Sequence, residues 1–127
     1  MATGLENLKI YLMAKELELK VFKLLKNFPP EEKFRSIDQL SRSSSSVTNN
    51  IAEAYNKKST KEKIRILNDI VKGEANETRS NLELCLEKGF HGEKNLISLY
   101  TELIMAISGY IRFIRNSEPQ TSKLNNF

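Results

Sequence analysis

The stretch Ser41-Arg42-Ser43-Ser44-Ser45-Ser46-Val47 decides how this sequence folds. Serine is a poor helix former, so the run could be a low-complexity linker. Apolar or small residues nevertheless continue through it in phase, at Phe34, Ile37, Leu40, Ser44, Val47, Ile51 and Ala54. Because this spacing of three to four residues is unbroken, we predict one helix from about Pro30 to Tyr55, with small serines that let a neighbouring helix approach closely.

Three further segments show the same helical period. The first, from about Leu5 to Phe28, ends at Pro29, because the residue before a proline is pushed out of the α region. The third begins at the capping box Ser59-Thr60-Lys61-Glu62 and stops at Gly89. The fourth runs from about Glu93 to Asn116. Valine is rare and the hairpin dipeptides Asn-Gly and Asp-Gly are missing from the sequence, so strands have almost no support.

Four helices joined by short turns predict an all-α fold, an up-down-up-down four-helix bundle. We assign residues 1–116 to this single domain and residues 117–127, which are polar and contain a proline, to a flexible C-terminal tail. A chain of 127 residues, 39% of them hydrophobic, can build such a core without metals or disulfides. The single Cys85 fits a reducing compartment, so we expect a cytoplasmic protein. No apolar run approaches the ~20 residues of a membrane span, and we expect no membrane partner.

The third segment carries more apolar surface than one core needs. The seam of the third segment consists of Ile64, Leu67, Val71, Ala75, Thr78, Leu82 and Cys85. On a helical projection, Ile66, Ile70 and Leu84 fall to one side of that seam. The resulting apolar arc is wider than the ~100° that one core requires. Extra apolar surface on an exposed helix is typical of a partner, and we predict that the chain associates with itself.

Residues for familiar catalytic or metal chemistry are scarce. His91 is the one histidine of the sequence and lies in a turn, so neither a carboxylate–histidine di-metal site nor a histidine-based triad can be built within one chain. Cys85 lies on the apolar seam, where a thiol is hard to ionise. We therefore expect no enzymatic activity, no metal and no cofactor. An alternative is an enzyme with a carboxylate-only site around Glu53, Glu74 and Glu77.

Glu74 and Glu77 fall within or beside the apolar arc of the third segment. A buried carboxylate needs a partner, and one polar stripe on the second segment offers candidates. We predict a structural polar network, inside one subunit or across an interface, made of Arg42, Asn49, Glu53, Glu74 and Glu77.

Positive charge is concentrated at the start of the third segment. Five basic residues and one acid lie between Lys57 and Arg65, a local charge of +4 that equals the formal net charge of the whole chain. A basic stripe suits contacts with phosphates, although a solvated charged face explains it equally well and no aromatic platform for bases accompanies it. Our candidate nucleic-acid-binding residues are Lys57, Lys58, Lys61, Lys63, Arg65 and Lys72. On the projection Arg79 continues this stripe, which Asp69 and Glu83 interrupt.

Several short motifs together resemble one known family. They are Leu5-Glu6-Asn7-Leu8-Lys9-Ile10-Tyr11, Phe28-Pro29-Pro30-Glu31-Glu32, Gln39-Leu40-Ser41-Arg42-Ser43, Ser46-Val47-Thr48-Asn49-Asn50-Ile51-Ala52-Glu53-Ala54-Tyr55 and Ser59-Thr60-Lys61-Glu62. The chain is similar to the four-helix bundle proteins encoded in intervening sequences of bacterial large-subunit ribosomal RNA. The sequence departs from that pattern at Ala54, where the family usually has Gly, at Tyr11, where it often has Trp, and at Ser44-Ser45, where small apolar residues are common.

The resemblance implies a homopentamer, a ring of up-and-down bundles around a central channel, without enzymatic activity. It also brings in the similar accessory proteins of diversity-generating retroelements, which bind a reverse transcriptase and nucleic acid through a basic surface. Two functions stay open. One is a homo-oligomeric bundle that binds structured RNA or DNA and works with a nucleic-acid-processing protein. The alternative is a protein-protein interaction scaffold without nucleic-acid binding.

Overall fold

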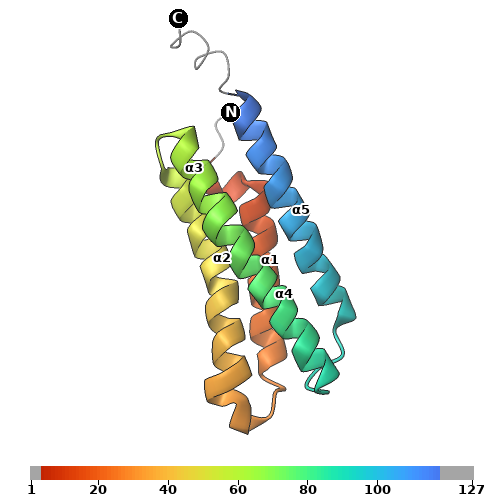
Figure 1. Cartoon of the computed structure of the whole chain (residues 1–127). Coiled ribbons are helices and arrows are strands. Elements are labelled where there is room, and N and C mark those ends of the chain that lie inside the picture. Colours follow the sequence, from red (N-terminus) through yellow and green to blue (C-terminus); the bar gives the residue numbers. More distant parts are fainter. Residues whose placement is uncertain (1–3, 118–127) are drawn as a thin grey trace, which may run out of the picture.

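Four long helical stretches run up and down beside one another in the computed structural model, which describes residues 4–117 (Figure 1). The first stretch is the 3-10 turn Leu5–Asn7 followed by α1, Lys9–Leu25. The fourth is α5, Lys94–Ser117. Within residues 4–117 there is no strand, so the all-helical bundle predicted from the sequence is confirmed. The predicted tail lies outside the described residues, except Ser117, which is the last residue of α5.

The second and third stretches are interrupted helices. The second passes from the 3-10 turn Pro30–Glu32 through the π turn Lys33–Ile37 into α2, Asp38–Asn56. The third passes from α3, Thr60–Ile66, through the π turn Leu67–Val71 into α4, Lys72–Glu87. A π turn holds one residue more than an α turn, so it shifts the helical phase of everything that follows.

The four stretches pack in the cyclic order α1, α2, α4, α5. The periodic residues predicted from the sequence supply most of the core. Its largest fully buried side chains are Tyr100, Leu40, Ile51, Ile66, Leu67, Leu82, Leu103 and Ile107. The up-and-down path brings the start of α1, the end of α2, the start of α3 and the end of α5 to the same end of the bundle (Figure 1).

The serine run is helical, as the apolar period predicted. Ser43 and Ser44 are buried on the inner face of α2. The Ser44 hydroxyl donates to the Leu40 carbonyl at 2.7 Å, which satisfies it without leaving the helix. The Ser43 hydroxyl is hydrogen-bonded to the hydroxyl of Thr78 on α4 at 2.8 Å. These short side chains therefore place a buried polar contact between α2 and α4.

Local signals define the ends of the third stretch. The Ser59 side chain accepts from the Glu62 backbone N–H at 3.1 Å, as the capping box predicted. Gly89 has a φ of +83°, the left-handed conformation that a helix C-terminus favours. His91, beyond it, is half-buried: one ring nitrogen lies 2.8 Å from the Leu82 carbonyl, and the other accepts from the Glu93 N–H at 3.0 Å. His91 therefore ties α4 to α5.

Two apolar predictions fail at the π turns. Phe34, expected in the core, is 84% exposed because it lies in the first π turn, where Arg35 has non-helical dihedral angles. Ile66, expected on a free face, is buried immediately before the second π turn. Of the extra apolar residues predicted on this stretch, only Leu84 is exposed. A uniform helical projection cannot reproduce these positions, because each π turn shifts the phase.

Helix α5 also bears on the expectation that the chain has no membrane span. By length and composition alone it could cross a membrane. Its inner stripe, however, packs into the bundle through Leu96, Tyr100, Leu103, Ile107 and Ile111. Core helices of bundles pass the same test of length and composition, so the test gives only weak evidence of a span.

Candidate nucleic-acid interface

Most of the predicted basic residues lie at the end of the bundle where α2 ends and α3 begins (Figure 1). We call this end, with the adjoining end of α5, the basic end. Lys58 and Lys61 are exposed, and within residues 4–117 neither forms an ion pair. Lys57 lies 3.7 Å from a Glu53 carboxylate oxygen, a long and solvent-exposed pairing of little energetic weight. Three ammonium groups, from the end of α2 to the start of α3, are thus available to phosphates.

The other two basic residues of this segment are engaged within the chain. The Lys63 ammonium donates to the Tyr55 carbonyl at 2.7 Å and stands 5.5 Å from the centre of the Tyr55 ring. Arg65 donates to Glu62 at 3.2 Å. This hydrogen bond and the charge of the guanidinium lower the pKa of the Glu62 carboxyl. Lys63 and Arg65 therefore contribute to the local potential while they hold the start of α3 in place.

Lys72 is separated from the basic end. It is the first residue of α4, about 16 Å along the helix from Lys61 at ~1.5 Å per residue. Arg79 lies further along and donates to Thr101 and Asn76, which ties it to α5 and to its own helix. The basic stripe drawn on an ideal helix is therefore two groups, and the group at the end of the bundle holds the available charges.

The structure adds residues that sequence reasoning missed. Arg112 and Arg115 are exposed on the last turns of α5, whose end lies at the basic end. Phe113, between them in sequence, is 65% exposed, and its ring centre lies 6.3 Å from that of Tyr110. The only sequence signal was a pair of arginines three residues apart, and nothing local connected it with Lys58.

The predicted polar network is divided. Arg42, Glu74 and Glu77 line one groove between α2 and α4, with a volume of about 270 Å³. Arg42 forms its ion pair with Asp38, at 3.1 Å. Burial and the neighbouring Glu77 raise the pKa of the Glu74 carboxyl, and Arg42 opposes this rise. The remaining two members lie elsewhere: Asn49 is exposed and Glu53 faces Lys57.

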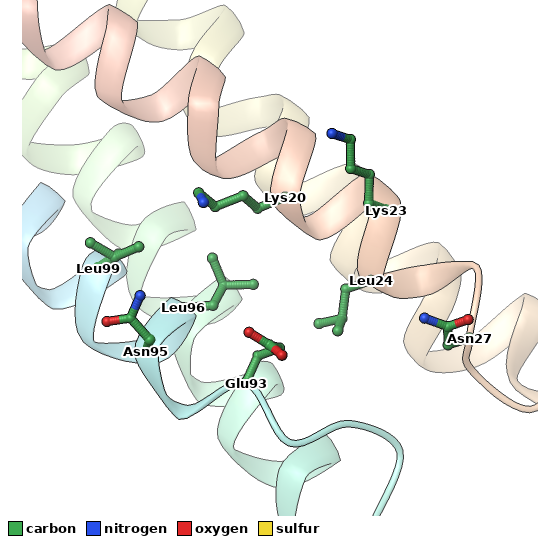
Figure 2. Close-up of a pocket in the computed structure, with 8 residues that line it drawn as sticks. All are labelled: Lys20, Lys23, Leu24, Asn27, Glu93, Asn95, Leu96 and Leu99. Atoms are coloured by element: carbon green, nitrogen blue, oxygen red, sulfur yellow. The ribbon is translucent and has the colours of Figure 1, made fainter.

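A second groove runs between α1 and α5 towards the opposite end of the bundle (Figure 2). Its volume is about 280 Å³, and Leu24, Leu96 and Leu99 line it. Lys20 and Lys23 stand on its α1 side, and within the described part of the chain neither forms an ion pair. These two lysines match Lys58 and Lys61 in charge and in lack of an ion pair, so they provide a control for charge effects.

The described residues contain no cluster of three or more His, Cys, Asp or Glu side chains that could hold a metal ion. Cys85 is buried on the inner face of α4. Glu53, Glu74 and Glu77, which an enzyme with a carboxylate-only site would need together, do not share one groove.

The fold and this surface define a small four-helix bundle with exposed cations gathered at the basic end. The family model for the 23S rRNA-intervening sequence protein matches residues 6–109. The chain therefore belongs to that family, as the motifs from Leu5 to Glu62 indicated. No curated protein matches the chain.

Proposed function

We propose that this chain is a non-enzymatic, cytoplasmic, self-associating bundle that binds structured RNA or DNA through its basic end. The observation that carries the proposal is the pair Lys58 and Lys61, exposed and without ion pairs among residues 4–117. Arg112 and Arg115 add charge at the same end. The family's connection with intervening sequences of 23S rRNA makes RNA the first ligand to test.

Self-association is supported by the outer face of α1. Leu12, Leu19 and Phe22 are between 46% and 59% exposed there. Together with Lys15 and Lys26, these residues are spaced alternately three and four positions apart. This is the spacing with which helices pack against one another. A homopentamer, as the resemblance implies, would repeat the basic end five times around one axis. Several weak patches on one particle bind an extended nucleic acid far more tightly than one patch.

Binding to a fluorescently labelled RNA hairpin at low salt tests the proposal. We compare the native chain with Lys58→Glu/Lys61→Glu and with the matched variant Lys20→Glu/Lys23→Glu. Both double variants change the net charge equally, but only the first alters the basic end. We expect the first to lose at least about tenfold in affinity and the second to remain close to native, because the phosphate contacts are local. Equal losses in both variants would contradict the proposal.

The second candidate function is a protein-protein interaction scaffold without nucleic-acid binding. The exposed apolar face of α1 and the groove of Figure 2 favour it, since both offer apolar surface beside lysines. Failure of the native chain to bind RNA or DNA at low salt would favour this candidate over the first.

A further inference from the structure

Aromatic side chains gather at the basic end beside the cations. Phe113 and Tyr110 come from α5, and Tyr55 comes from the last turn of α2. The rings of Phe113 and Tyr110 are inclined by 31°, with their centres 6.3 Å apart. The Tyr55 ring carries the Lys63 ammonium over its face. The fold thus brings aromatic side chains to the same end of the bundle as Lys58 and Lys61, which the sequence did not predict.

Tyr110 and Phe113 differ in what they can offer a ligand. Tyr110 is half-buried and packs against the core. Burial raises the pKa of its hydroxyl, and the neighbouring Tyr55 adds a smaller effect in the same direction. Phe113 is instead 65% exposed. Tyr110 therefore packs against one side of Phe113, whose remaining surface is exposed to solvent on the helical turn that also carries Arg112 and Arg115.

We propose that the basic end takes unpaired nucleotides, with a base stacked on Phe113 and phosphates of the same strand held by Arg112, Arg115, Lys58 and Lys61. This inference rests on the proposed nucleic-acid function and specifies its substrate class. Bases within a duplex already stack on each other and cannot stack on a side chain, whereas bases of loops and single strands can. A flexible strand can also follow charges that come from two different helices.

The sequence contains no tryptophan, which provides a direct probe. In Phe113→Trp the new indole is the chain's sole tryptophan fluorophore, and it keeps an aromatic surface at the same place. We expect a uridine or thymidine 20-mer to quench its fluorescence on binding, because a stacked base lies against the indole. A blunt duplex of equal length should bind without that quenching. Met105→Trp on the same helix, where Met105 is 67% exposed, is the control and should show no quenching with either ligand.

Affinity measurements provide a second test of stacking on Phe113. We expect Phe113→Ala and Phe113→Leu to weaken single-strand binding by about fivefold to 150-fold, the range measured for one stacked base, and to leave duplex binding unchanged. Met105→Ala should leave both unchanged. Comparing the RNA and DNA 20-mers shows whether the 2′-hydroxyl contributes to binding.

Three results would overturn the inference: equal effects of Phe113→Ala and Met105→Ala, equal losses on single strand and duplex, or a change of molecular mass in Phe113→Ala. The last would assign Phe113 to a subunit interface. Failure of the proposed function is distinguishable from these, since the native chain would then bind neither ligand at low salt.

Discussion

The hydroxyls of Ser43 and Thr78 are hydrogen-bonded at 2.8 Å in the buried layer between α2 and α4. The Thr78 hydroxyl oxygen also lies 2.8 Å from the Glu74 carbonyl of its own helix, so when its single proton is donated there, Thr78 accepts from Ser43. The pair shows why a helix can pass through the serine run: each buried hydroxyl has a partner, so burial costs little.

Removing one member of this pair should destabilise the fold. Thr78→Val keeps the shape of the side chain but leaves the Ser43 hydroxyl without its partner, so we expect a loss of about 1–2 kcal/mol in the free energy of unfolding. Ser43→Ala/Thr78→Val should cost less than the sum of the two single variants, because the second change removes the orphaned group. Urea denaturation of the four proteins measures both quantities. Strict additivity would show that the two hydroxyls are not coupled.

For Tyr100 we predict the opposite effect: removal of its hydroxyl should stabilise the fold. Its ring is fully buried, and within residues 4–117 its hydroxyl has no hydrogen-bond partner. Burial accordingly raises the pKa of this phenol. Tyr100→Phe removes an unsatisfied polar atom at almost constant volume, so we expect it to raise the free energy of unfolding by about 1 kcal/mol. A destabilised variant would mean that the hydroxyl is satisfied in solution.

The pH dependence of stability tests the groove between α2 and α4. The pKa of the Glu74 carboxyl is raised in the folded chain, so its ionised form is less favourable there than in the unfolded chain. This penalty is present at pH 7 and disappears as the pH falls below the ordinary carboxyl value near 4.5. Glu74→Gln should therefore raise the melting temperature at pH 7 by more than at pH 4. Equal gains at both pH values would contradict the burial of this carboxylate.

Self-association through α1 predicts a change in molecular mass. In light scattering, the native protein should have a molecular mass above the 14.6 kDa of the monomer. Leu19→Glu/Phe22→Glu should return it to the monomer, because the two carboxylates would be buried in an apolar contact. Phe34→Glu, which alters an exposed aromatic residue outside that face, should leave the mass unchanged. If both variants keep the native mass, the outer face of α1 is not the interface.

Much of the fold could be predicted because its signals are local. Ser59 and Gly89 mark helix ends through their own backbone partners and dihedral angles, and the serine run keeps its apolar phase. Whether Phe34 and Ile66 face the core or the solvent could not be predicted, because a periodic pattern contains no signal for a π turn.

The candidate site, like the fold, could be predicted only where its signals are local. The charge at Lys58 and Lys61 is visible in the sequence, since the residues are neighbours along one turn. Phe113 and its flanking arginines join them only because the up-and-down path returns the end of α5 to the start of α3. Their location at one end of the bundle depends on topology, and no short motif contains it.

The salt dependence of binding tests the central claim most directly. The observed affinity for a single-stranded 20-mer should fall linearly with salt on logarithmic axes, by ~0.7 for each phosphate neutralised. Neutralising two contacts in Lys58→Gln/Lys61→Gln should reduce the magnitude of that slope by about 1.4, whereas Lys20→Gln/Lys23→Gln should leave it unchanged. Identical slopes in all three proteins would contradict the assignment of the basic end as the nucleic-acid interface.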